Sequence, residues 1–226
     1  MTVNSLLERA KLLFLHLLFP SFCCSCKTPL PYNQLVCEKC SEALSKGRIK
    51  KSRVRTLYGR RFIIHSVYSY EDDNEAATIV KRLKFAHSFN CANYIGKVIA
   101  DKARSLRKEY DIVTFVPMSP FAEYDRTFNQ CEYIASRVSK QLGIKEQNCL
   151  RKVRFTKKQH QLSSVDRRRN LKDAFRCRKN VAGKRILLID DVTTTGTTLS
   201  ECANELYKGG AVSVTSVAFS LTKPKR

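Results

Sequence analysis

The apolar residues of the C-terminal half form short runs that alternate with amphipathic stretches. Residues 186–189 are four consecutive apolar residues, and 111–116 is apolar apart from Asp111 and Thr114, as is typical of strands buried on both faces of a sheet. Segments 129–142 and 199–207 have the apolar spacing of helices, and 211–220 predicts a last strand. Because strand, loop and helix alternate from residue 111 onward, we predict an α/β fold whose parallel sheet is flanked by helices.

The N-terminal half divides into smaller units. Ser5 and Glu8 form a capping box at the start of an amphipathic helix over residues 5–19. Further on, the pattern predicts a hairpin over 56–70 and helices over 75–85 and 91–108. We therefore predict three parts: an amphipathic helix in 1–20, a small cysteine-containing module in 21–45 and an α/β domain in 55–226.

The polar residues that follow the strand at 186–189 are ordered as in a ligand-binding site. Asp190 and Asp191 come first, and a run of threonines around Gly196 leads into the next helix. Small hydroxyl residues around a glycine let backbone N–H groups converge on an anion, and a helix N-terminus adds partial positive charge. Two carboxylates would repel a phosphate, so they fit the hydroxyls of a ribose, directly or through a metal. No Walker A sequence is present.

Four of the ten cysteines form two Cys-x2-Cys pairs, Cys23 with Cys26 and Cys37 with Cys40. Two such pairs present four thiolates to a tetrahedral Zn²⁺ ion, and this site would be structural because no coordination position stays open. Two disulfides are the alternative, but they conflict with a reducing compartment. Cys24 is left over. The remaining five cysteines lie in or beside apolar segments and should behave as small hydrophobes: Cys91, Cys131, Cys149, Cys177 and Cys202.

No secretory signal is visible near the N-terminus. The apolar run 12–19 contains His16, lacks a small-residue cleavage site and is too short to span a bilayer. We therefore expect no transmembrane segment and a cytoplasmic location. Peripheral attachment at the inner face of the membrane stays open, because the helix over 5–19 needs a surface to pack on: this protein's core, a partner or a membrane.

The chain is strongly basic. Lysine and arginine number 42 against 20 acidic residues, which gives a net charge of +22. This excess suggests a polyanionic partner such as nucleic acid, although a basic surface on an enzyme with phosphorylated substrates is the alternative. Basic groups at 48–61 and 151–169, with Tyr58, Phe62 and Phe155 among them, could follow a single strand and stack its bases. The candidate DNA-binding residues are Arg151, Lys152, Arg167, Arg168 and Arg169.

The segment 190–198 resembles the 5-phosphoribosyl-1-pyrophosphate (PRPP) motif of type I phosphoribosyltransferases. Other segments are similar to the ComF family of competence-associated proteins, which belongs to the same superfamily: the paired Cys-x2-Cys motifs, Leu83-Lys84-Phe85, and the segments 125–130 and 159–170. The resemblance covers nearly the whole chain in the correct order. It implies a type I phosphoribosyltransferase-like fold with an N-terminal zinc ribbon.

The resemblance also implies a function and a set of site residues. It predicts a bacterial protein that assists uptake of single-stranded DNA in transformation, with a helicase-like competence protein as partner. Asp190 and Asp191 would hold the ribose of PRPP together with Mg²⁺, and Arg126 would stabilise the departing pyrophosphate. The phosphate would be bound by Thr194, Thr195, Gly196, Thr197 and Thr198.

One loop departs from the family pattern. Where the family often has a histidine after a core strand, this chain has Ser119, and the basic residues just beyond it are missing. The sequence therefore leaves two functions open. The chain is a DNA-uptake protein on a PRPP-binding scaffold, or it is an active phosphoribosyltransferase that transfers ribose 5-phosphate from PRPP to an unknown acceptor. Homo-oligomer formation is also left open.

Overall fold

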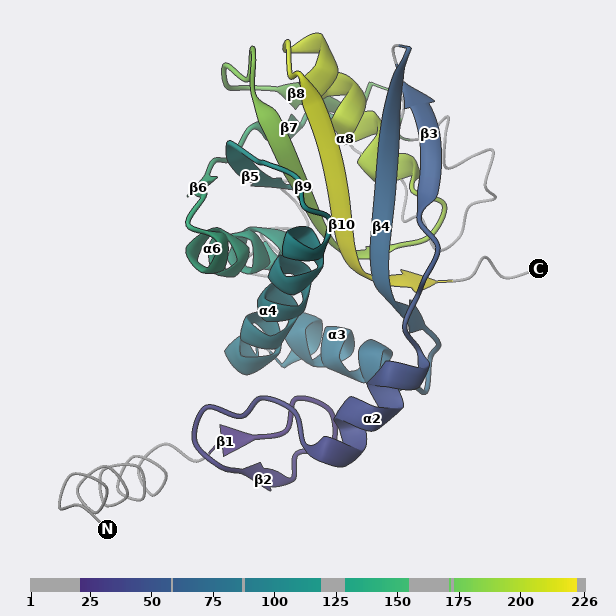
Figure 1. The fold of residues 1–226 in the computed structure, drawn as a ribbon, viewed down its shortest axis with the longest axis vertical. Coiled ribbons are helices and arrows are strands. Elements are labelled where there is room, and N and C mark those ends of the chain that lie inside the picture. Colours follow the sequence, from purple (N-terminus) through teal and green to yellow (C-terminus); the bar gives the residue numbers. More distant parts are fainter. Residues whose placement is uncertain are drawn as a thin grey trace, which may run out of the picture.

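The structure is a computed structural model, and it describes residues 21–57, 59–86, 88–118, 129–154, 171 and 173–222 (Figure 1). Several sequence predictions lie outside these residues. They are the helix over 5–19, the loop that contains Ser119, the aromatic residues Tyr58 and Phe155, and the cations Arg126, Arg167, Arg168 and Arg169.

A six-stranded sheet forms the centre of the molecule, with the strand order β3-β4-β10-β9-β5-β6 (Figure 1). Neighbouring strands from β4 to β6 run parallel, and only β3 is antiparallel to its neighbour β4, as the predicted hairpin requires. The predicted α/β sheet is therefore confirmed. Its strands are β3 (Arg53–Leu57), β4 (Arg60–Tyr70), β5 (Ile112–Phe115), β6 (Lys145–Glu146), β9 (Arg185–Thr193) and β10 (Ser213–Thr222).

Both faces of the sheet are covered. Helices α3 (Glu75–Phe85), α4 (Phe89–Ser105) and α6 (Gln130–Leu142) share one hydrophobic core with the sheet. Helix α8 (Thr197–Lys208) and a two-stranded sheet of β7 (Leu150–Lys152) and β8 (Phe175–Cys177) pack against the other face. Leu187 and Ile189 of β9 point into the first core, and Ile186 and Leu188 point into the second. This alternation explains why the strand consists of consecutive apolar residues.

Strand β9 is longer than the predicted 186–189. It continues through both acidic residues to Thr193, because β10 runs beside it and pairs Ala218 with Asp190 and Leu221 with Thr193. The hydrogen bonds of a neighbouring strand thus keep polar residues in strand geometry where the apolar pattern has already ended. The carboxylates are consequently held on a sheet strand, and the turn begins only after Thr193.

The N-terminal module consists of β1 (Ser21–Phe22), β2 (Pro29–Leu30) and α2 (Glu38–Lys46). It lies at the end of the molecule toward which the parallel strands point, next to α3 (Figure 1). Cys24 and Leu44 of the module belong to the same core as α3 and α4. Arg82 of α3 also donates hydrogen bonds to the carbonyl oxygens of Cys23 and Cys24, at 3.4 and 3.1 Å. The module is therefore joined to the larger domain by apolar and polar contacts.

Helices α4 and α6 approach each other closely. A Cβ atom at Gly96 of α4 would lie 2.5 Å from the Cβ of Arg137 of α6, so the absence of a side chain at Gly96 allows this packing. Among the residues that the structure describes, no helix combines the length and apolar character needed to cross a bilayer.

Candidate functional site

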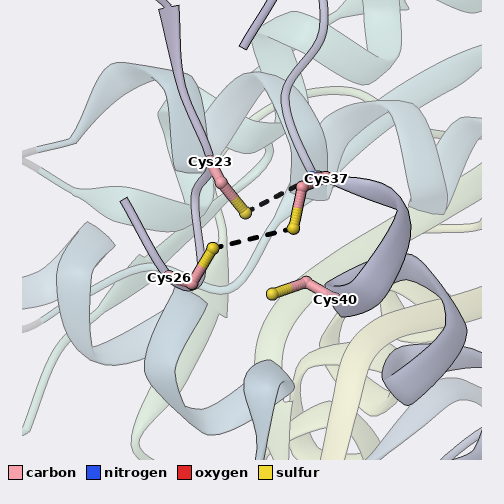
Figure 2. A group of neighbouring side chains, drawn as sticks. All are labelled: Cys23, Cys26, Cys37 and Cys40. Carbon is pink, nitrogen blue, oxygen red and sulfur yellow. Dashed lines mark hydrogen bonds between the residues drawn. The ribbon is translucent and has the colours of Figure 1, made fainter. Parts of the chain in front are cut away.

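The four cysteines of the two Cys-x2-Cys pairs lie together at one end of the module. Cys23 and Cys26 flank the turn after β1, while Cys37 precedes α2 and Cys40 lies in its first turn (Figure 2). Their sulfur atoms all lie within 4.8 Å of one another, and the Cys26 and Cys37 sulfurs are 3.6 Å apart. Tetrahedral coordination with metal–sulfur bonds of about 2.3 Å puts neighbouring sulfurs ~3.8 Å apart. The cluster therefore has the geometry of a metal site, and its four thiolates fit Zn²⁺.

The surroundings favour a thiolate at one of these positions. Hydrogen bonding by Thr28, whose hydroxyl oxygen lies 3.1 Å from the Cys26 sulfur, lowers the pKa of Cys26 to about 6. Cys24, the cysteine left over in the sequence, is not part of the cluster and is buried in the main core, where its carbonyl accepts a hydrogen bond from the Cys91 thiol. The geometry therefore selects Cys23 over Cys24 as the fourth member.

The threonine-rich segment forms a tight turn between β9 and α8. Gly196 is the N-cap of α8 with a left-handed φ of 78°, and a Cβ atom there would lie 2.5 Å from Cδ1 of Ile64. Only glycine fits this position without strain. The hydroxyl oxygens of Thr195 and Thr197 are 2.7 Å apart, and the Ser200 hydroxyl donates to the Gly196 carbonyl at 2.9 Å. The turn thus presents hydroxyl and backbone N–H groups at a helix N-terminus, as an anion site requires.

Two arginines of β3 hold the turn from outside. The Arg53 guanidinium donates a hydrogen bond to the Thr194 carbonyl, and that of Arg55 donates to the Thr195 carbonyl at 2.8 Å. Burial lowers the pKa of Arg53, with the charge of Arg55 adding to the effect. In the sequence these arginines belong only to the basic group at 48–61. The structure gives them a second role, because they fix the turn and bring positive charge to its edge.

The two carboxylates lie beside this turn and are nearly buried, at 7% exposure each. One oxygen of Asp190 accepts hydrogen bonds from the Asp191 backbone N–H at 2.9 Å and from the Cys131 thiol at 3.5 Å. Asp191 accepts a bond from the Val192 backbone N–H at 2.7 Å and forms an ion pair of 2.8 Å with Lys84. Burial and the neighbouring Asp191 raise the pKa of Asp190 well above its usual range.

Lys84 is the site residue whose role the sequence does not indicate. It lies in the last turn of α3, and its Nζ reaches a carboxylate that is 107 positions away in the chain. Burial acts to lower the pKa of Lys84, but the negative charges of Asp191 and Asp190 raise it overall. The ammonium thus compensates two adjacent carboxylates that would otherwise repel each other. The only sequence signal for Lys84 is its place in the Leu83-Lys84-Phe85 segment.

The carboxylates could also contact a cation. One oxygen or sulfur atom from each of Cys131, Asp190 and Asp191 lies within 4.8 Å of the others. Carboxylate oxygens suit Mg²⁺, whereas a thiol does not, and burial raises the pKa of Cys131, which favours its neutral form. Lys84 already supplies positive charge to Asp191. The donor set therefore fits Mg²⁺ only through the carboxylates.

Replacing Lys84 with methionine should lower the free energy of unfolding by about 2–3 kcal/mol at pH 7.5. This is less than the roughly 3–5 kcal/mol lost when a fully buried pair loses one partner, because the Lys84 side chain is 22% exposed. Carboxyl groups with raised pKa values in the folded state favour folding at low pH, so the loss should shrink at pH 5.

Urea unfolding at the two pH values measures this effect. Lys97→Met is the matched control, because its ion pair with Asp101 is exposed on both sides and should contribute little. An equal loss in Lys84→Met at both pH values would contradict the charge-compensating role.

The predicted DNA-binding residues that the structure describes differ in their surroundings. Arg151 of β7 is exposed. Lys152 is half-buried, with its Nζ 6.0 Å from the centre of the Phe175 ring, and burial lowers its pKa. Phe62 is fully buried in the core and therefore cannot stack bases. Of this group, Arg151 alone is described and openly accessible.

Comparison with known proteins agrees with this geometry. The phosphoribosyl transferase domain family matches residues 129–226. DNA utilization protein YhgH of Salmonella typhimurium is 28% identical over 200 residues, which cover 86% of this chain and 81% of that protein. Competence protein F of Haemophilus influenzae is 30% identical over 141 residues, which cover 58% of this chain and 62% of that protein.

Among solved structures, glutamine phosphoribosylpyrophosphate amidotransferase from B. subtilis matches with a TM-score of 0.40 and 23% identity, covering 66% of this chain and 29% of that chain. The relatives and the family match agree with the strand, turn and helix described above. The chain is thus similar over much of its length to DNA utilization protein YhgH and competence protein F, and its residues 129–226 match the phosphoribosyl transferase domain family.

Proposed function

We propose that this chain binds PRPP on its phosphoribosyl transferase scaffold and assists the uptake of single-stranded DNA in bacterial transformation. One observation carries the proposal: a glycine-containing anion turn and two buried carboxylates lie together in a chain of net charge +22. The names of the relatives, which refer to DNA utilization and competence, support the DNA part of the proposal.

In this proposal the turn and the acidic pair bind different groups of PRPP. The segment 194–198 would bind the 5-phosphate through N–H and hydroxyl groups, with Arg53 and Arg55 fixing its shape. Asp190 and Asp191 would accept hydrogen bonds from the ribose hydroxyls. Mg²⁺, when bound with PRPP, would neutralise pyrophosphate oxygens, and Arg126 would add a further positive charge.

The four cysteines would hold one structural Zn²⁺ ion. Four thiolates complete a tetrahedral shell, so the ion would have no open position for chemistry. Its contribution would be to fold the module that lies against α3 and supplies carbonyl acceptors to Arg82. In this way the metal would support the helix that carries Lys84.

Single-strand binding should depend strongly on salt, because each neutralised phosphate releases counterions. The slope of log affinity against log salt is about −0.7 per phosphate contact for single strands. Replacing Arg167, Arg168 and Arg169 together with alanine should flatten this slope by up to about 2 units. Fluorescence anisotropy with a labelled oligonucleotide at several salt concentrations measures it.

A charge-matched control uses three exposed cations that precede β9: Arg178, Lys179 and Lys184, each replaced with alanine. If the salt slope is determined by phosphate contacts of residues 167–169, and not by net charge alone, the control variant should keep the slope of the parent protein. Equal slopes in both triple variants would remove 167–169 from the DNA-binding surface. A slope near zero in the parent would remove DNA from the proposal.

Turnover of PRPP is a second candidate, because both carboxylates and the anion turn are present as an enzyme would need them. It differs from binding alone by the release of pyrophosphate when a base is supplied with PRPP and Mg²⁺. The helicase-like partner, a homo-oligomer, peripheral membrane attachment and the division into 1–20, 21–45 and 55–226 stay predictions.

A further inference from the structure

Two phenylalanines near the candidate PRPP site are unusually exposed. Phe85, the last residue of α3, is 74% exposed, and Phe89, the first residue of α4, is 55% exposed. These are the largest exposed fractions of any aromatic side chain that the structure describes. Leaving such large apolar surfaces in water gains nothing for folding, so two exposed rings beside one candidate site are candidates for a ligand contact.

The aromatic surface continues onto α6. The rings of Phe89 and Tyr133 lie 4.9 Å apart at an angle of 44°. The Arg137 guanidinium lies 4.7 Å from the centre of the Tyr133 ring and donates a hydrogen bond to the Tyr133 hydroxyl. We call Phe85, Phe89 and Tyr133 the aromatic platform. The three residues come from α3, α4 and α6, which share one core on the same face of the sheet, and Phe85 is four positions before Phe89 in the chain.

The aromatic platform is directly connected to the PRPP motif. Phe85 follows Lys84, whose ammonium pairs with Asp191 at 2.8 Å. The Lys84 side chain therefore points toward the carboxyl end of β9 while the ring of the next residue stays in solvent. A ligand on the platform would lie beside the candidate PRPP site without needing to enter it.

Cations lie on the helices that carry the aromatic platform, and the exposed Glu132 precedes Tyr133 on α6. Lys81 and Arg82 lie on α3 with Phe85, and Arg137 lies on α6 with Tyr133. Lys81 and Arg82 donate hydrogen bonds to backbone carbonyls, and Arg137 donates to a tyrosine hydroxyl. These acceptors are uncharged, so they do not neutralise the three cations. Within the described ranges none of these three cations forms an ion pair with a carboxylate. Exposed rings among uncompensated cations are the combination that binds single-stranded nucleic acid.

We propose that bases of single-stranded DNA stack on the aromatic platform while the phosphates face the surrounding cations. The proposal rests on the DNA-binding function proposed above and adds where the bases are held. It also predicts that the interaction tolerates any base sequence, because every base offers a flat face to a ring. If the rings instead contact a partner protein, they would do so as apolar surfaces, and oligonucleotide binding would not depend on them.

Tryptophan fluorescence tests the contact directly, because the chain contains no tryptophan. Phe85→Trp places a single reporter on the aromatic platform and keeps a stacking ring. Val212→Trp is the matched control, since Val212 is 56% exposed and precedes β10 at the opposite end of the sheet strands. Single-stranded oligonucleotide should quench the Phe85→Trp emission and leave the Val212→Trp emission unchanged.

A second measurement separates stacking from charge. Phe85→Leu and Phe89→Leu keep apolar side chains but remove flat rings, and each should weaken oligonucleotide binding about 5- to 100-fold, as stacking on one ring predicts. An abasic oligonucleotide of equal length has the same phosphates without bases. It should bind the parent protein and the leucine variants with equal affinity.

The outcomes distinguish this proposal from the broader one. If the parent protein does not bind the oligonucleotide at all, the proposed DNA function fails. If the parent binds but Phe85→Trp is not quenched and the leucine variants keep full affinity, the aromatic platform is overturned while DNA binding stands. Quenching by free nucleobases without quenching by oligonucleotide would also overturn it, in favour of a small-molecule site.

Discussion

Replacing Cys37 with serine should abolish zinc binding and unfold the N-terminal module while the six-stranded sheet stays folded. The module's own core is small, because it consists of Cys23, Leu30 and Cys40 with two partly buried neighbours, and its contacts with the larger domain attach the module without fixing its internal fold. Structural zinc sites contribute apparent free energies on the order of 10–16 kcal/mol, and this energy is folding energy. Metal analysis should fall from one zinc per chain to none.

Limited proteolysis measures the structural consequence. New cleavage sites should appear between residues 21 and 47, and the sheet should stay protected. Cys24→Ser is the matched control, since Cys24 is the neighbour of a ligand but lies in the main core. It should keep its zinc even if the core loses stability. Zinc loss in Cys24→Ser, with retention in Cys23→Ser, would overturn the ligand assignment.

Loss of zinc should also weaken the ligand site at a distance. Arg82 of α3 donates hydrogen bonds to the carbonyls of Cys23 and Cys24, and the same last turn of the helix carries Lys84 and Phe85. If the module unfolded, the Arg82 guanidinium would lose both carbonyl acceptors and hydrogen-bond to water instead. The end of α3 would then be free to fray. The cysteine cluster and the candidate PRPP site are thus connected through the last turn of α3.

Features that depend on local sequence were predicted well. The strand before Asp190, the turn at Gly196 and the helix after it follow from apolar spacing and from residues with special backbone preferences, all within about 20 positions. The cysteine cluster was predicted for the same reason, because each Cys-x2-Cys pair is a local turn. In these cases the residues that determine the structure are neighbours in the chain.

Features that depend on contacts between distant segments were not predicted. Lys84 meets Asp191, and Arg53 meets the Thr194 carbonyl, only after the sheet has brought β3, α3 and β9 together. The length of β9 depends likewise on β10, a strand that comes later in the chain. The basic composition indicated an anionic ligand, but it could not separate arginines that hold a turn from those that face solvent.

PRPP binding should fall by at least about 100-fold when Asp190 and Asp191 are both replaced with alanine. Each hydrogen bond between a charged group and a hydroxyl contributes roughly 1.5–3 kcal/mol, and the double variant loses at least two of them. The substitution raises the net charge from +22 to +24, because two negative charges are removed from the sequence. A site that held PRPP by positive charge alone would therefore bind more tightly, and the two explanations differ in sign.

Isothermal titration calorimetry with PRPP and Mg²⁺ measures this difference. The charge-matched control is Asp101→Asn with Asp173→Asn, because both carboxylates are half exposed and lie outside the site. It has the same net charge as the double alanine variant and should bind PRPP like the parent protein. Because the alanine variant leaves Lys84 without its partner, it should also be tested with Lys84→Met added, which removes the unpaired ammonium and lowers the net charge from +24 to +23. Unchanged or tighter binding in both forms would show that the carboxylates do not hold the ribose.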